Sequence, residues 1–200
     1  MWWRGLITAI CVAVAILGLS CGGATTSSHD DICACAPSSP DSADYRHDAK
    51  HVPIPDLPPQ EIDVTTILSW KIPPTPANDA PRTGRELQVF HIARAFARDV
   101  RVVADDCDLH IEISQTADLN APRVIVETPI DSEYCPARRS LHDALQQSGF
   151  AVSNTQGGEL PQPTPVEVTG LAFLDKPHNR GSALVATTWE LHPAIVNLVP

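Results

Sequence analysis

The chain has 200 residues and a formal net charge of −10, and 19% of its residues are charged. This length is that of one domain, or of two only if both are small. The negative charge argues against a general nucleic-acid binder, because such proteins need a basic surface to neutralise phosphates. Proline is in excess at 19 residues, and ten of these prolines lie between Cys21 and Pro81.

The N-terminus has the pattern of an export signal. Arg4 gives it a short positive start, and an apolar run over residues 5–19 follows. This run has signal-peptide length and is shorter than the ~20 residues of a membrane span. Cys21 comes just after the run, as in the lipobox of bacterial lipoproteins, where the thiol is acylated. We expect residues 1–20 to be a signal peptide and Cys21 to be the lipidation site, with simple cleavage and secretion as the alternative.

Residues 21–82 have the composition of a linker. The first part is rich in Gly, Ser and Thr, and the prolines that follow interrupt any helix or central strand. Such a segment forms an extended, semi-rigid spacer. We therefore predict a Pro-rich disordered linker that holds a domain of residues 83–200 away from a membrane. Within the linker, residues 62–72 are strand-like and are the part expected to dock on the domain edge.

Strand patterns occupy most of residues 83–200. Apolar and charged residues alternate over 109–113, which is the period of a strand with two different faces. A short helix is predicted over 140–148, where Ser140 suits the N-cap and Gly149 can end the helix. Further strands are expected over 123–128, 166–174 and 189–199.

The segment 86–98 decides the fold class, because its pattern fits either a helix or the first part of a strand over 86–103. As one long strand it gives the order β-β-β-α-β-β, which is that of the OB-fold barrel with its helix between strands three and four. A barrel also removes exposed strand edges. We therefore predict a mainly β fold, an OB-like five-stranded barrel with one short helix behind a disordered stalk. A helix over the same segment would give an α+β sandwich, which is the alternative.

Six cysteines are present, of which one leaves with the signal and Cys21 is the expected lipid site. The other four form an even set in an oxidising compartment. Cys107 precedes the second predicted strand and Cys135 follows the third. Antiparallel neighbours bring such ends together, so we predict a Cys107–Cys135 disulfide. Cys33 and Cys35 remain as C-A-C in the linker, where they can close a small ring with each other or, less favourably, bind a metal.

Carboxylate and imidazole side chains recur at i, i+2 spacing on two predicted strands. Asp108, His110 and Glu112 share one face of the second strand, and Glu190 and His192 share a face of the last. Such groups can hold a divalent metal that lowers the pKa of a bound water, and a carboxylate can orient a histidine as general base. The alternative is that they form only the solvent-exposed face of the barrel. Candidate catalytic residues are Asp108, His110, Glu127, His178, Glu190 and His192. Candidate metal ligands are Asp108, His110, His178 and His192.

Several short motifs occur in a fixed order in the domain: D-x-D-x-H, E-x-P, a cysteine, a helix, G-x-x-F-x-D-x-x-H and E-L-H-P. They lie at residues 106–110, 127–129, 135, 170–178 and 190–193. In this order they resemble a group of small exported bacterial proteins of uncharacterised function, which carry glycine where this chain has Cys107. The resemblance covers the domain from about residue 85 and implies no established activity. The barrel order is also similar to that of staphylococcal-nuclease-like proteins, but their catalytic Asp, Arg and Glu pattern has no counterpart here.

Two functions from different classes follow from these features. The first is a membrane-tethered extracytoplasmic lipoprotein whose OB-like domain binds a saccharide or an envelope protein, with no nucleic acid and no cofactor. The second is a metal-dependent, phosphodiesterase-like hydrolase that uses the Asp and His motifs and needs a divalent metal. Clustering of His110, His178 and His192 within metal-ligand reach would favour the second. In both cases we expect the protein in the bacterial cell envelope, lipid-anchored at Cys21, or secreted if Cys21 is not acylated.

Overall fold

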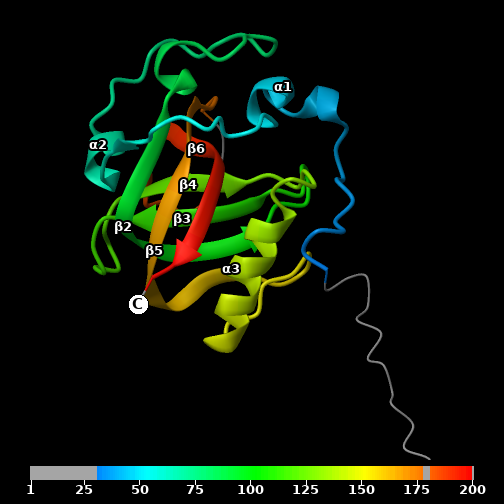
Figure 1. Ribbon diagram of the computed structural model, residues 1–200, viewed down its shortest axis with the longest axis vertical. Helices are drawn as coiled ribbons and strands as arrows, with labels where there is room; N and C mark the ends of the chain where they lie inside the picture. The colour runs from blue at the N-terminus through cyan, green and yellow to red at the C-terminus, as the bar shows by residue number, and fades with distance from the viewer. Residues whose placement is uncertain (1–30, 178–180, 200) are drawn as a thin grey trace, which may run out of the picture.

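The computed structural model describes residues 31–177 and 181–199. The expected signal peptide, Cys21 and His178 lie outside these described residues. The main strands are β2 (Val89–Val102), β3 (Leu109–Ser114), β4 (Arg123–Thr128), β5 (Gly158–Leu174) and β6 (Val185–Leu198). They pair in the order β2-β3-β4-β6-β5, and β5 also pairs with β2, so the strands close a barrel (Figure 1). In the part of the chain described, no helix combines the length and apolarity that crossing a bilayer requires.

The barrel has the OB-fold order. β4 and β6 run parallel while the other neighbours are antiparallel, and α3 (Cys135–Gln147) lies between β4 and β5. This confirms the predicted β-β-β-α-β-β order and excludes the α+β alternative. β2 is a strand because it pairs with β5 from Val89 to Val100 and with β3 from Phe96 to Val102, with a bulge between Ala97 and Asp99.

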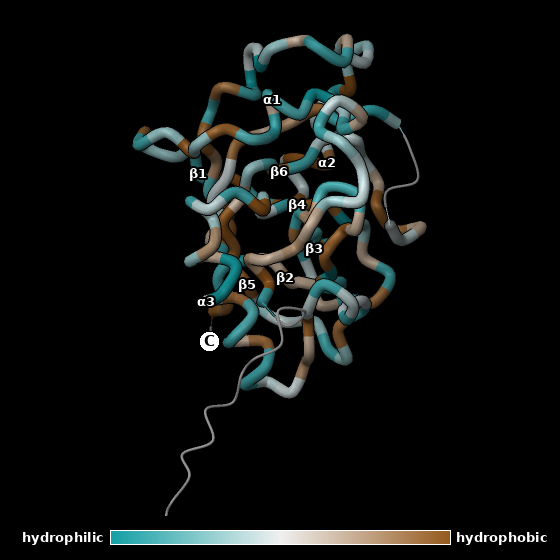
Figure 2. Tube along the Cα trace, turned by 90° about the vertical axis from the view of Figure 1, so that its right-hand side faces the viewer, coloured by the Kyte–Doolittle hydropathy of each residue, from teal (hydrophilic) through white to brown (hydrophobic). Residues whose placement is uncertain are grey.

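The alternation predicted for β3 is confirmed, and its apolar residues face the barrel interior. Leu109, Ile111 and Ile113 are buried in one core cluster with residues of the neighbouring strands. Leu141 and Leu145 of α3 join the same cluster and cover the barrel on one side. Figure 2 shows hydrophobic and hydrophilic stretches interleaved along the chain in this part of the molecule.

The helix α3 begins five residues before the predicted range of 140–148, with Tyr134 as its N-cap. Pro136 lies in the first turn, where its missing N–H would have had no helical partner. Ser140 is therefore inside the helix and is not its cap, which corrects the prediction. Gly149 follows the helix with a φ of 87°, a left-handed conformation that glycine adopts without a steric cost.

Residues 31–82 wrap over the barrel, which corrects the prediction of a disordered linker (Figure 1). We call residues 31–82 the N-terminal segment. Val64 and Ile67 are completely buried against the barrel core, and Ile32 is buried with them. The strand-like stretch at 62–72 does dock on the barrel, but it does so mainly as a helix. The elements of the N-terminal segment are short: η1 (Asp41–Ala43), α1 (His47–Lys50), β1 (Gln60–Glu61) and α2 (Val64–Leu68). β1 pairs in parallel with β2, and η2 (Gly84–Leu87) follows the segment.

Buried arginines hold the N-terminal segment in place. A proline-rich segment offers many carbonyl acceptors but few N–H donors, and a guanidinium carries five donors. The Arg46 side chain donates to the carbonyls of Ala80 and Pro81. Arg138, on α3, donates to the carbonyl of Ile32 through Nε and Nη2 at 3.0 and 2.8 Å. These contacts give the segment one conformation although it has little regular secondary structure.

Within the described residues, two disulfides tie the start of this segment to the barrel, Cys33–Cys135 and Cys35–Cys107. The predicted Cys107–Cys135 disulfide is therefore wrong, and so is a ring between Cys33 and Cys35. Each barrel cysteine takes its partner from the N-terminal segment instead. Cys107 has a φ of 67°, in the left-handed region that favours glycine, so the turn before β3 forms although cysteine occupies this position.

Candidate functional site

The polar side chains of β3, β4 and β6 form one buried layer on the outer face of the barrel. We call this layer the polar face. It is opposite the apolar core residues of the same strands, and the exposed fractions of its members lie between 0% and 8%. The face is not the solvent-exposed surface that was the alternative interpretation, because the N-terminal segment covers it. Its members are Asp108, His110, Glu112, Glu127, Glu190 and His192.

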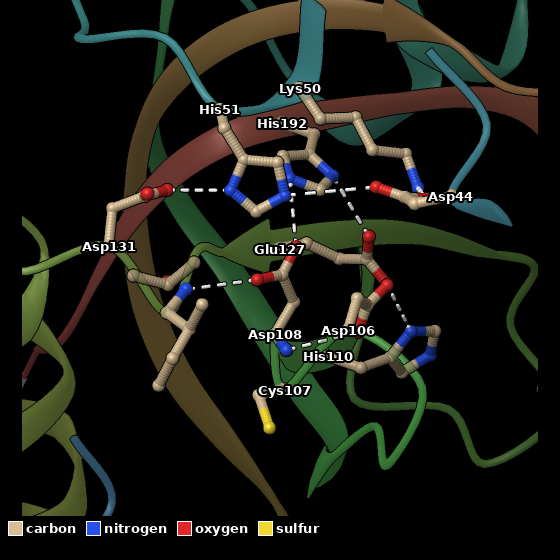
Figure 3. Close-up of polar contacts among 12 residues, drawn as sticks. Asp44, Lys50, His51, Asp106, Cys107, Asp108, His110, Glu127, Asp131 and His192 are labelled. Carbon is tan, nitrogen blue, oxygen red and sulfur yellow. Dashed lines mark hydrogen bonds and ion pairs between the residues drawn. The ribbon is translucent and has the colours of Figure 1, made fainter. Parts of the chain in front are cut away.

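Glu127 joins the two predicted groups of side chains. β3 and β6 are not neighbours, and β4 lies between them. Oε1 of Glu127 lies 2.8 Å from Nδ1 of His110, and Oε2 lies 2.9 Å from Nδ1 of His192 (Figure 3). Burial alone would raise the pKa of Glu127, but its contacts with His110 and His192 hold that pKa well below its usual value. The carboxylate is therefore ionised and bridges two imidazoles.

His192 has a carboxylate at each ring nitrogen. Nε2 lies 3.1 Å from Oδ2 of Asp108, on the side of the ring away from Glu127. Oδ1 of Asp108 accepts the backbone N–H of Ile130 at 2.9 Å, which holds this carboxylate in place. Burial would lower the pKa of His192, yet pairing with Asp108, Glu127 and Glu190 holds it well above its usual value. Both ring nitrogens of His192 thus lie within ion-pair distance of a carboxylate, although neither makes a hydrogen bond with a described residue.

His110 is the histidine of the polar face that lines a cleft, although it is itself buried. Burial acts to lower its pKa, but pairing with Glu112 and Glu127 raises that pKa to about 9. Its Nε2 makes no hydrogen bond with any described residue. Glu112 accepts hydrogen bonds from Arg123 and Ser182 at 3.0 and 2.6 Å, and these contacts, with that of His110, lower its pKa to about 2 although burial opposes this. His110 can therefore donate a proton or a hydrogen bond at neutral pH.

Gly181 lets the β5–β6 loop approach His110 and Glu112 closely. A Cβ on this residue would overlap the Glu112 carboxylate and would come within 3.4 Å of His110 Nε2. Its φ of 120° is also one that other residues rarely adopt. A side chain at this position would push the loop away from the polar face.

A cleft of about 380 Å³ opens beside the polar face. It lies between the β2–β3 loop, the β5–β6 loop and the N-terminal segment, and His110 and Glu127 are at its base. In OB-folds, the face of strands two and three and these two loops form the ligand surface. Asp106, on the β2–β3 loop, has its pKa raised to about 7 by burial and by the nearby Asp108 and Glu127. The cleft thus contains an acid that is half-protonated near neutral pH.

The predicted metal ligands come together only in part. Asp108 and His192 do lie together with Glu127, with one possible ligand atom of each within 4.8 Å of the others. However, Asp108 and Glu127 face opposite nitrogens of His192, so the three side chains already pair with one another without a metal. His110 joins them through Glu127 and is not in the ligand group, and His178 is outside the described residues.

Three functional side chains come from the N-terminal segment, and the sequence interpretation missed them. Lys50 is 6% exposed and lines the cleft, and Asp44 and His51 lie beside it over the polar face (Figure 3). Burial opposes the charge of Lys50, but Glu127, Glu190 and Asp44 raise its pKa. The sequence H-D-A-K-H at residues 47–51 was an available signal, since imidazole and ammonium groups are unusual in a linker.

Comparison with protein-family models, with curated proteins and with solved structures finds no match to this chain. The strand order identifies the barrel, and the geometry of the polar face and the cleft is the basis for the proposed function.

Proposed function

We propose that the protein is a lipid-anchored extracytoplasmic binding protein whose OB barrel takes a small, hydroxyl-rich ligand of the saccharide class into the cleft. The observation that carries this proposal is the position of the cleft, on the surface that OB-folds use for ligands. Its volume of about 380 Å³ is in the range of small-molecule sites. A segment that closes one side of the cleft limits the ligand to a few sugar units.

The charges of the cleft support a neutral, hydroxyl-rich ligand. Asp105 and Asp106 offer acceptor oxygens, while Lys50 and Arg101 offer donors on the other walls. A sugar hydroxyl both donates and accepts a hydrogen bond, so it can use both kinds of group. The carboxylates disfavour a nucleic acid, whose phosphates they would repel.

The proposed anchor would keep the barrel close to the membrane. If Cys21 is acylated, eleven residues separate it from Cys33, the first residue that a disulfide ties to the barrel. Even fully extended, this chain spans at most roughly 40 Å. The chain between the proposed anchor and the barrel is therefore a short tether and not a long stalk. A short tether suits capture of a ligand near the membrane surface.

Backbone amide spectra of the mature chain, titrated with short cell-envelope saccharides, test the binding proposal. We expect shifts for residues of the cleft, and a weaker affinity for the variant Arg101→Ala, which removes a donor from the cleft wall. Arg139→Ala is a matched control, because Arg139 is exposed and lies on α3. Shifts confined to other surfaces, or none with any saccharide, would overturn the proposal.

A metal-dependent hydrolase is the second candidate, and the grouping of Asp108, Glu127 and His192 favours it. A metal held by these three side chains would replace the ion pairs that His192 makes with Asp108 and Glu127. His110 would donate a proton to the leaving group. Hydrolysis of a phosphodiester such as bis(p-nitrophenyl) phosphate, measured with and without divalent metals, tests it. Metal-dependent turnover that is lost in His192→Ala would support the hydrolase, and turnover unchanged in that variant would exclude this site.

A further inference from the structure

A second group of side chains that could bind a metal lies on the N-terminal segment, outside the predicted ligand set. Asp44 precedes α1, His47 begins it and His51 is its C-cap, so one turn of chain brings the three side chains together. Oδ2 of Asp44 lies 3.4 Å from Nδ1 of His47 and 3.7 Å from Nε2 of His51. All three atoms lie within 4.8 Å of one another.

These same three atoms are buried and make no hydrogen bond with the residues that the structure describes. The side chain of His51 is 8% exposed and that of Asp44 is 12% exposed. Buried polar atoms normally have a partner, because leaving one without a partner costs free energy. Three such atoms this close together are the arrangement that one bound ion could satisfy.

Other side chains hold the second nitrogen of His51 and the second carboxylate oxygen of Asp44. Nδ1 of His51 lies 2.6 Å from Oδ2 of Asp131, and Figure 3 shows the His51 ring between Asp131 and Asp44. Lys50 donates from Nζ to Oδ1 of Asp44 at 3.0 Å, which leaves Oδ2 directed at the histidines. Metal-binding histidines almost always give their second nitrogen to a carboxylate or carbonyl, which fixes the tautomer and the ring orientation. Asp131 provides this contact for His51.

We propose that Asp44, His47 and His51 bind one divalent transition-metal ion, with Zn²⁺ the best fit. Two imidazole nitrogens and one carboxylate oxygen are ligands that Zn²⁺ accepts, whereas Ca²⁺ and Mg²⁺ prefer oxygen alone. Three protein ligands leave a fourth position for water or another ligand, as in zinc sites that react with or bind small molecules. A cavity of about 180 Å³ adjoins the cluster and gives this position room.

The proposed metal site and the polar face are neighbours. The rings of His51 and His192 are 6.1 Å apart, and Asp44 lines both this cavity and the larger cleft. A ligand in the cleft and one on the metal would thus be close to each other. The metal proposal stands without the saccharide proposal, because its ligand atoms are defined by the N-terminal segment alone.

Zinc titration of the mature, chelator-treated protein by calorimetry tests the site. We expect one equivalent of Zn²⁺ to bind, and His47→Ala and His51→Ala to weaken binding at least a hundredfold. His91→Ala is the matched control, since His91 also contacts a carboxylate, with Nδ1 2.8 Å from Glu61, but lies far along the chain on β2. Unaltered affinity in both His47 and His51 variants, or absence of Zn²⁺ binding to the wild type, would overturn the proposal.

Two further measurements keep the test independent of folding defects. The visible spectrum of the Co²⁺-loaded wild type should show the intense bands of a four-coordinate ion with nitrogen ligands, and six-coordinate bands would contradict the proposal. Asp131→Asn should weaken binding roughly 10–100-fold, the usual effect of losing the partner of a ligand histidine. Asp108→Asn separates the two candidate metal sites. Zinc binding that is retained in Asp108→Asn supports the site on the N-terminal segment. Zinc binding that is lost in Asp108→Asn but retained in the His47 and His51 variants assigns the metal to the polar face.

Discussion

The barrel and the N-terminal segment are held in two different ways. The barrel has an apolar core and paired strands that satisfy its backbone, so its stability comes from burial and from regular hydrogen bonds. The N-terminal segment has little regular structure and is fixed by two disulfides, buried arginines and a few apolar anchors. A segment of irregular backbone can thus be as ordered as a strand when side chains satisfy its carbonyls.

The polar face lies where these two regions meet, and both contribute to its chemistry. The barrel places Glu127 and His192 on one face, and the segment brings Lys50 and His51 over them. Covering the face removes water from the carboxylates and imidazoles, which strengthens their mutual attraction. The segment therefore decides the charges of the site as well as its shape.

Removing the Cys33–Cys135 disulfide should have the largest effect on the segment. Because the Cys35–Cys107 disulfide remains in the double variant Cys33→Ser/Cys135→Ser, the loop that is released is about 30 residues, and the loss should be about 3 to 4 kcal/mol in the chain-entropy model. Unfolding in guanidinium chloride measures this loss. Limited proteolysis should then cut within residues 31–82 first, and early cleavage within the barrel instead would contradict the division into two regions.

Arg138→Met should have the next largest effect. It leaves the carbonyls of Ile32, Thr128 and Cys107 without the guanidinium that they now share. A buried carbonyl without a partner costs about 1 kcal/mol or more, so we expect a loss of about 3 kcal/mol in total. The free energy of unfolding measures it, and a loss below about 1 kcal/mol would show that the arginine is not needed to hold the segment.

The pH dependence of stability tests the polar face. The folded-state pKa of His110 is about 9, above its usual value of 6.5, so its pairing stabilises the fold fully below pH 6.5. This contribution should be lost as the pH rises toward 9, by at most about 3 kcal/mol. Chemical unfolding at pH 6.5 and at pH 9 measures the change. In His110→Gln the difference between the two pH values should shrink, and an unchanged difference would contradict the paired imidazolium.

Arg139→Met should have the smallest effect. Arg139 pairs with Asp31 at 3.2 Å, but the two side chains are 58% and 40% exposed, so solvent screens the pair. We expect a change within about 0.5 kcal/mol by the same unfolding measurement. A loss as large as that of Arg138→Met would mean that exposed ion pairs also hold the segment, and the comparison of the two arginines would fail.

The barrel could be predicted because each of its strands carries its own pattern. The alternation in β3 and the shared spacing of Glu190 and His192 placed the charged residues on one face, and the structure agrees. The disulfides could not be predicted in this way, since four cysteines allow three pairings and the choice depends on contacts distant in sequence. The bridging role of Glu127 likewise depends on β4 lying between β3 and β6.

The sequence by itself determined most of the strands and which side chains share a face, because these depend on a period of two along a short stretch of chain, whereas β2 was left open between strand and helix. Only the tertiary structure decided that the charged face is buried. A period of two shows that the two faces of a strand differ, but it does not show what covers either of them. The cover is a proline-rich segment whose order comes from distant disulfides and guanidinium contacts, and local patterns do not encode such contacts.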